Sequence, residues 1–230
     1  MKDWTIRGIF IGLAGPACLV LAACSGGADA EPDIEAADVT EADLPNMALQ
    51  VDFVEIDGVR LQLNPEEGGF LTREEMLEES WDPDEAAADI DRFGLEAHHD
   101  QTFLGSALVR QPVFFACTGL SLYTTHEGAT GDLSDSLQEV EAEIGTANPE
   151  GHRLLKASRF DVDGLEDAVG MKMTGQWNTG DVFYSTWVSF VRGRVMGIVQ
   201  VASLDDRDLT SEAARMASDL DRQMATVLEE

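Results

Sequence analysis

Two adjacent histidines followed by an aspartate, His98-His99-Asp100, are the side chains of this sequence best suited to binding a metal ion. Imidazole nitrogens and carboxylate oxygens are common zinc ligands. The surrounding residues favour an extended strand, in which neighbouring side chains point to opposite faces of a sheet. His98 and His99 therefore cannot easily bind one ion together, and we interpret them as surface or interfacial imidazoles. A metal held by one of them with a distant partner is the alternative.

A separate histidine, His126, is followed by Glu127, as at the start of a zinc-protease helix. That helix needs a second histidine four residues after the first, and Thr130 occupies this position. We therefore interpret His126 as part of the first turn of a helix, where Glu127 favours the helix dipole. The sequence also lacks a G-x-S-x-G nucleophile motif, a phosphate-binding loop and a dinucleotide fingerprint. It predicts no catalytic residues and no cofactor.

Asp161 and Asp163 belong to an acidic stretch, residues 161–167, that has the carboxylate density of a calcium-binding loop. An EF-hand loop requires a glycine at its sixth position. Here the glycine, Gly164, is the fourth residue of the stretch. A turn between two strands explains the sequence equally well, so calcium binding remains the weaker alternative.

The N-terminal residues have the parts of an export signal. Lys2 and Arg7 give a positive start, and an apolar run from Gly8 to Ala22 follows. This run is too short for a comfortable transmembrane helix, which needs about 20 residues. Small residues then lead to Cys24. The segment therefore predicts secretion, and the cysteine decides the kind of signal.

The sequence Leu21-Ala22-Ala23-Cys24 resembles the lipobox of bacterial lipoproteins. In that family the cysteine takes a diacylglycerol, the peptide before it is removed, and the new amine is acylated. The resemblance implies that Cys24 becomes the first residue of the mature protein. It also implies a location in the cell envelope, lipid-anchored on the outer face of the cytoplasmic membrane or in the outer membrane. An ordinary secretory signal that is cleaved after Ala23 is the alternative.

The residues after the cysteine predict a tether. Residues 25–45 carry seven acids and no base, with almost no large apolar side chains. Such a composition cannot bury enough surface to fold. We therefore expect a signal peptide at 1–23, a disordered acidic tether at 24–45 and an exported folded domain at 46–230.

The charge of the chain restricts its partners. Forty-four acidic residues against 15 basic residues give a net charge of −29. A polyanion of this size is repelled by nucleic acid and by anionic lipid headgroups. We expect no nucleic-acid partner, and contact with the membrane only through the lipid on Cys24. Cys117, in an apolar context, is interpreted as a small buried hydrophobe.

Hydrophobic periodicity, capping residues and turn residues predict the elements of the folded part. Strands are expected at 47–53, 59–63, 95–104, 112–124, 159–162, 168–174 and in a long hairpin at 182–203; helices are expected at 72–79, 82–94, about 127–144 and 209–227. This order predicts an α+β fold, mainly an antiparallel sheet with helices packed on it. Each half ends with a hairpin and a helix, which indicates either a duplicated unit or the repetition of common motifs.

The long hairpin also carries a faint family resemblance. Its central sequence, residues 188–196, followed by a closing helix, resembles the end of PsbP-like α/β sandwiches, a fold found in small exported lipoproteins. The resemblance covers about the last 60 residues, and it implies a fold more than a function.

Three functions remain open at this stage. The first is a non-catalytic, membrane-anchored module that binds an envelope protein or a small ligand. The second is a metal-dependent envelope hydrolase that uses His98, His99 or His126. The third is a structural part of an envelope complex. The anchor and the missing catalytic motifs favour the first.

Overall fold

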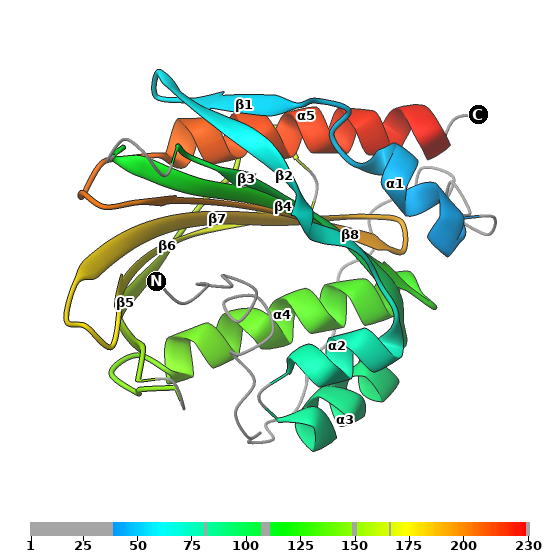
Figure 1. Cartoon of the computed structure of the whole chain (residues 1–230). Helices are drawn as coiled ribbons and strands as arrows, with labels where there is room; N and C mark the ends of the chain where they lie inside the picture. Colours follow the sequence, from blue (N-terminus) through cyan, green and yellow to red (C-terminus); the bar gives the residue numbers. More distant parts are fainter. Residues whose placement is uncertain (1–38, 81, 107–110, 149–150, 166, 229–230) are drawn as a thin grey trace.

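The computed structural model describes residues 39–80, 82–106, 111–148, 151–165 and 167–228. They form one eight-stranded antiparallel sheet with helices on both faces (Figure 1). The strands are β1 (Phe53–Ile56), β2 (Val59–Leu71), β3 (Leu95–Leu104), β4 (Val113–Tyr123), β5 (Arg153–Phe160), β6 (Val169–Gln176), β7 (Val182–Arg192) and β8 (Val195–Ser203). The helices are the short η2 (Glu41–Asp43) and α1 (Leu44–Met47), then α2 (Arg73–Glu79), α3 (Pro83–Phe93), α4 (His126–Ala142) and α5 (Thr210–Leu228). The predicted α+β class is confirmed.

The strand order, β1-β2-β3-β4-β8-β7-β6-β5, divides the sheet into two similar halves. Each half is a four-stranded meander, and the last strands of the two meanders, β4 and β8, pair antiparallel in the centre. A long helix follows each meander, but α4 and α5 lie on opposite faces of the sheet (Figure 1). The halves therefore repeat in strand order and differ in where their helices pack.

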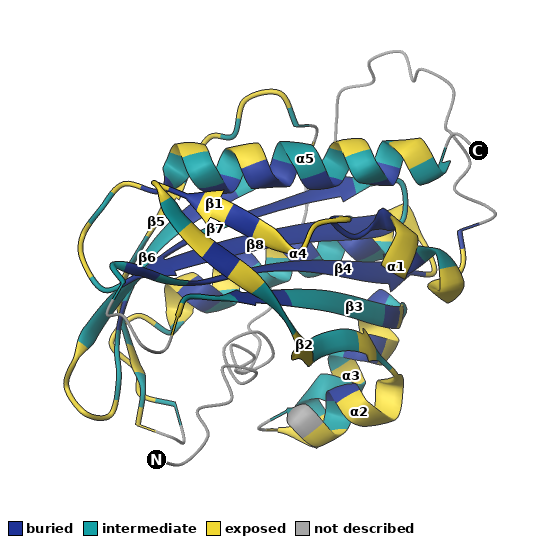
Figure 2. Ribbon diagram, turned by 45° about the horizontal axis from the view of Figure 1, so that its top comes forward, coloured by how far each residue is buried: buried dark blue, intermediate teal, exposed yellow. Residues whose placement is uncertain are grey.

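The larger core lies between the sheet and α5. Strands β4, β7 and β8 are largely buried, and α5 turns one face toward them (Figure 2). The buried side chains of α5 are Ala213, Met216, Ala217, Leu220 and Met224. Leu220 is fully buried in one cluster with Val188, Phe190 and Val199 of the sheet. The apolar stripe predicted for the closing helix is therefore confirmed.

Local sequence signals fix several element ends. Thr72 caps α2 in a reciprocal capping box with Glu75. Asp82 caps α3 by accepting from the backbone of Glu85, and Gly94 ends the helix at a φ of 70°. The turn between β1 and β2 uses positive φ at Asp57 and Gly58. These predicted boundaries are confirmed.

Four predicted boundaries are wrong. Met47 lies in α1, so the strand expected from 47 starts only at Phe53. Strand β2 continues to Leu71, beyond the end expected at 63. Strand β5 begins at Arg153 and not at 159, because its residues have mixed burial and no clear alternation. Ile144 lies beyond the end of α4 and is 43% exposed, so it is not part of that helix's buried face.

Part of the expected tether also folds. Val39 is buried, and Leu44 is fully buried in the core on the α5 side of the sheet. Thr40 and Asp43 form a capping box at η2. The boundary expected at 46 is therefore too late, because two apolar residues at the end of an acidic stretch suffice to dock it. The remainder of the tether, the signal segment and Cys24 lie outside the described residues.

Hydrogen bonds hold this segment, residues 39–46, against the domain. Arg194, at the turn between β7 and β8, donates to the carbonyls of Val39 and Tyr123 and pairs with Glu96 at 2.6 Å. Gln223 of α5 donates to the carbonyl of Asn46 at 2.8 Å. Among the described residues, no helix is both long and apolar enough to cross a membrane.

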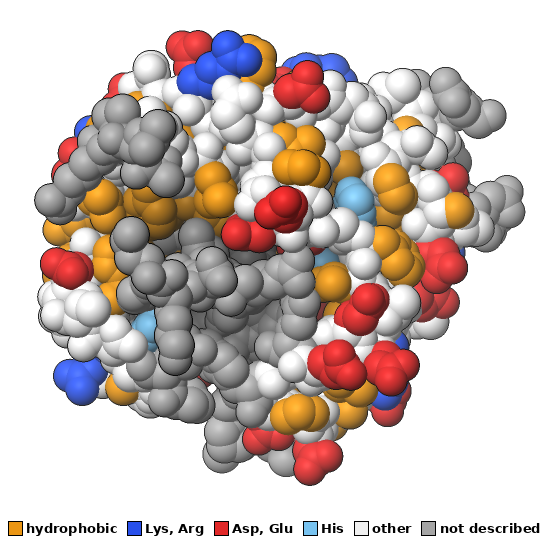
Figure 3. Space-filling view, viewed as in Figure 1, with side chains coloured by type: hydrophobic (Ala, Val, Ile, Leu, Met, Phe, Trp, Pro, Cys, Tyr) orange, Lys and Arg blue, Asp and Glu red, His pale blue; other side chains and the backbone are white. Residues whose placement is uncertain are grey.

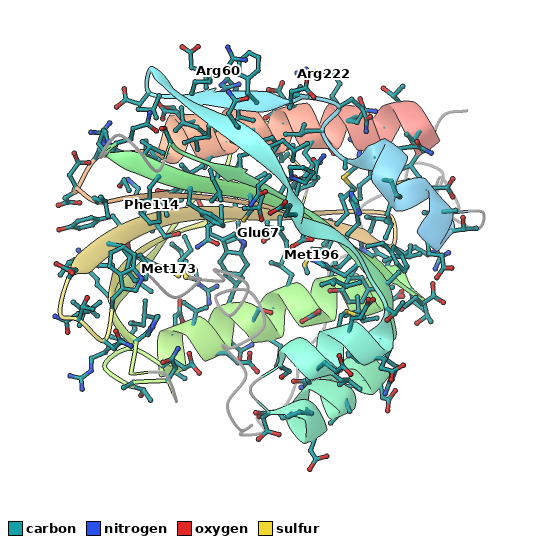
Figure 4. All side chains as sticks on the ribbon, viewed as in Figure 1. Arg60, Glu67, Phe114, Met173, Met196 and Arg222 are labelled. Carbon is teal, nitrogen blue, oxygen red and sulfur yellow. The ribbon has the colours of Figure 1, made fainter. Side chains whose placement is uncertain are left out.

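The α5 packing predicts a contrast between two nearby positions. Leu220→Ala removes a fully buried side chain, which costs about 2–5 kcal/mol through lost burial and a cavity. Arg222 has a 73% exposed side chain on the outer side of α5, so Arg222→Ala should change the melting temperature little (Figure 4). Thermal unfolding of both variants checks the assignment. A larger loss for Arg222→Ala would contradict it.

The packing of residues 39–46 predicts that removing them lowers the stability of the domain. A chain that begins at Asn46 lacks the buried side chains of Val39 and Leu44, and one buried leucine alone contributes about 2–5 kcal/mol. Its melting temperature should be roughly 5 °C or more below that of a chain that begins at Asp38. Leu44→Ala in the longer chain should reproduce much of the loss. Equal melting of the two lengths would show that the segment does not stabilise the domain.

Candidate functional site

The face of the sheet that α4 covers differs from the α5 side in carrying buried polar side chains. Met173 and Met196 mark this face between the strands and α4 (Figure 4). The strand register places polar residues on the same face as these methionines. The buried ones are Thr102, Ser121, Ser185, Ser189 and Gln200. A buried polar group is unfavourable unless it is hydrogen-bonded, so each of these needs a partner.

One group of these residues forms a hydrogen-bonded chain. His98 Nδ1 lies 2.9 Å from Ser121 Oγ, on the neighbouring strand. Ser121 contacts the hydroxyl of Tyr123, and Tyr123 donates to Asp132 of α4. Because Tyr123 uses its proton on Asp132, Ser121 must donate to Tyr123 and His98 must donate from Nδ1. The chain thus links β3, β4 and α4 with every donor pointing toward Asp132.

The environment shifts the pKa values of this chain in consistent directions. Loss of water around the imidazole lowers the pKa of His98 to about 4, so the ring is neutral at pH 7. Burial, followed by the nearby Asp132 carboxylate, raises the pKa of Tyr123 well above its ordinary value. Burial also raises the pKa of Asp132, against the hydrogen bonds from Tyr123 and Ser136. A neutral His98 that donates to Ser121, and a protonated Tyr123 that donates to Asp132, agree with these pKa directions.

The two adjacent histidines point to opposite faces, as their strand position predicts. His98 faces the α4 side, whereas His99 neighbours the core residues Ala97 and Phe103 on the α5 side. His98 lies at the interface between the sheet and α4, where its partly buried ring is bonded to Ser121. Asp100 lies two residues from His98 along β3, opposite Gly119. His98 and His99 therefore do not converge on one ion.

The other candidate ligands make separate contacts. His126 opens α4, as predicted, and its Nδ1 is 2.7 Å from the carbonyl oxygen of Gly193. Asp161 and Asp163 are exposed in the turn between β5 and β6. Within the described ranges, no group of three His, Cys, Asp or Glu residues is placed to hold a metal ion.

A second polar group lies at the middle of the α4 side. Register aligns four residues across the central strands: Thr102, Cys117, Gln200 and Trp187. Gln200 donates to Ser185 at 2.7 Å. In contrast, the indole Nε1 of Trp187 and the hydroxyl of Ser189 are buried, and neither has a hydrogen-bond partner among the described residues. Only the alternation of β7 could have indicated that these side chains share a face.

Cys117 lies next to this group and behaves as expected from its sequence context. It is 2% exposed, and burial raises the pKa of its thiol well above the ordinary value. It packs with Phe115, Ala202 and Leu104 in a small apolar cluster. The described members of that cluster all belong to strands, so no described helix residue takes part in it. The thiol is a packing group there and is poorly suited to act as a nucleophile.

Comparisons with known proteins give only distant likenesses. No protein-family model matches the chain, and no curated protein matches it. Among solved structures, the extracellular domain of PknH from Mycobacterium tuberculosis aligns with 84% of this chain and 98% of its own, at 11% identity and a TM-score of 0.48. A protein of unknown function, PA94 from Pseudomonas aeruginosa, aligns with 54% of this chain and 79% of its own, at 16% identity and a TM-score of 0.28. Neither likeness carries an argument about function.

The hydrogen-bonded chain predicts how His98 titrates. Its imidazole should protonate with a midpoint near pH 4 instead of 6.5. The neutral ring therefore contributes stability fully above pH 6.5, and this contribution is lost as the pH falls through about 4. Proton NMR of the His98 ring between pH 3 and 8 measures the midpoint. A midpoint near 6.5 would place the ring in water and contradict the buried chain.

Proposed function

We propose that this protein is an exported lipoprotein, anchored through Cys24, whose folded part is a non-catalytic binding module for a small ligand or an envelope partner. The anchor is supported by the sequence: a positive start, an apolar run and the lipobox-like Leu21-Ala22-Ala23-Cys24 follow one another. Several acyl chains on one cysteine would hold the protein firmly, whereas a single chain binds only marginally.

The observation that carries the binding role is a pair of buried polar groups on the α4 side that have no hydrogen-bond partner in the part of the chain that the structure describes. The indole N–H of Trp187 and the hydroxyl of Ser189 lie two residues apart on β7 and therefore on one face. A buried donor without a partner costs about 1–3 kcal/mol, so its retention calls for an explanation. A ligand with a hydrogen-bond acceptor would supply the missing partner, and Met171, opposite Trp187, would supply apolar contact.

The alternative of a metal-dependent hydrolase finds less support. It would need His98, His99 or His126 to share an ion or to activate a nucleophile. His98 is bonded to Ser121, His99 faces the other side of the sheet, and His126 contacts the turn at Gly193. Ser121, the hydroxyl nearest to an imidazole, is 4% exposed and bonded on both sides. The hydrogen-bonded chain is therefore better explained as structural.

The anchor predicts how the protein partitions between membrane and soluble fractions. Cys24→Ser removes the only thiol that the lipobox-like sequence offers for acylation, so the protein should leave the membrane fraction or remain unprocessed. Cys117→Ala is the matched control, because this buried thiol packs among apolar side chains and should not affect anchoring. Fractionation and the mass of the N-terminal peptide measure the result. Unchanged fractionation of Cys24→Ser, with no lipid mass on wild type, would overturn the anchor.

A further inference from the structure

Helices α3 and α4 pack with acidic stripes toward each other. On α4 the carboxylates recur every three or four residues, at Asp132, Asp135 and Glu139, which places them on one side of the helix. On α3, Glu85 and Asp89 are four residues apart in the same way. Figure 3 shows acidic side chains gathered over the region of α2 and α3. The contact between the two helices therefore brings like charges together.

The carboxylates influence each other across this contact. Desolvation, then Asp135, Asp89, Asp132 and Glu85, raises the pKa of Glu139 to about 8. Asp89 is affected in the same way, because burial and then Asp135 raise its pKa, while Arg92 opposes the rise. The ion pair between Arg92 of α3 and Asp135 of α4 places these two sides of the helices against each other, and carboxylates of both helices contribute to the raised pKa of Glu139.

The basic groups near the contact do not balance these acids. Arg92 of α3 pairs with Asp135 of α4, with Nη1 3.0 Å from Oδ2. Arg73 of α2 pairs with Asp91 instead, and Arg159 of β5 pairs with Glu141 on another side of α4. From β4, the buried Tyr123 reaches Asp132 as a neutral donor. Among the described residues, one arginine, Arg92, therefore pairs across this contact, which holds the five carboxylates named above. Placing so many negative charges close together is unfavourable.

We propose that the α2–α3 segment docks on α4 in a pH-dependent manner, held in mildly acidic medium and loosened when Glu139, which faces the carboxylates of α3, becomes ionised. Protonated carboxyl groups can donate hydrogen bonds to their neighbours, whereas ionised ones repel. Few apolar side chains anchor the segment: among the described residues of α2 and α3, Met76, Ile90 and Phe93 are the buried ones.

The docking contact is connected to the polar face of the sheet. Asp132 belongs both to the acidic stripe and to the chain that leads through Tyr123 and Ser121 to His98. Strand β3, which carries His98, follows α3 directly after Gly94. Release of α3 would therefore alter the cover of the α4 side and the solvation of Asp132. This inference rests on the helix contact and does not depend on the anchor or on a ligand.

The direction of the pH effect follows from the raised pKa values. A carboxyl whose pKa is higher in the docked state than in the free state favours docking while it is protonated. For Glu139 this contribution is full below the ordinary value of 4.5 and is lost as the pH rises through about 8. Because Glu139 is only about half removed from water, the effect is smaller than the full shift implies.

Hydrogen exchange of the full chain tests the proposal. Protection factors, corrected for the intrinsic pH dependence of exchange, are measured at pH 5 and pH 8 for amides of α3 and of α5. Protection of α3 should fall about tenfold or more at the higher pH, because one pKa unit corresponds to a factor of ten. Helix α5 packs on the other face of the sheet, so its protection factors at pH 5 and pH 8 should agree within about threefold. This agreement would show that the sheet remains folded at both pH values.

Two matched variants distinguish an effect of the carboxylates that face α3 from an effect of the total negative charge of α4. Glu139→Gln keeps the size of the side chain and removes its charge, so α3 should remain protected at pH 8. Glu141→Gln makes the same change on the same helix, at a residue that pairs with Arg159 instead, and should behave as wild type. Equal α3 protection at both pH values in wild type would overturn the proposal. So would an equal effect of the two variants.

Discussion

The pairing of β4 with β8 is the interaction on which the rest of the structure depends. It joins two four-stranded meanders into one sheet and places both strands in the centre, where both of their faces are covered. All nine residues of β8 are buried, and β4 is buried at all but one position. A strand covered on both sides must fill two different environments with alternate residues. The two faces of this pair therefore carry separate roles.

The α5 side is built for stability. It combines the apolar face of α5 with aliphatic strand residues and the docked segment that begins at Val39. The α4 side has polar groups in place of part of that apolar packing: the hydrogen-bonded chain from His98 to Asp132, and Trp187 and Ser189, whose polar atoms have no partner among the described residues. Polar burial of this kind lowers stability unless something compensates, and natural proteins retain such features at sites of function. Both the proposed binding role and the proposed pH response therefore belong to the α4 side.

The sequence predicts the elements where a local cause operates. The capping boxes, the Asp57-Gly58 turn and the stripe of α5 act within a few residues, so their positions follow from composition and spacing. Strand β5 and the docking of Leu44 depend on contacts with distant strands, which periodicity does not report. The burial of His98 belongs to the same class, because it follows from the pairing of β3 with β4. The acidic stripes were visible as spacings, but only the fold brings them face to face.

The binding role is tested most directly at the indole of Trp187. A crystal structure of the protein, isolated from its own host without a denaturing step, shows what lies beside Nε1. The account predicts density for a bound molecule with an acceptor atom within about 3 Å of this nitrogen, the usual length of such a hydrogen bond. A site in which Nε1 is bonded to the protein's own side chains, or holds water alone, would contradict the assignment of the α4 side as a ligand-binding face.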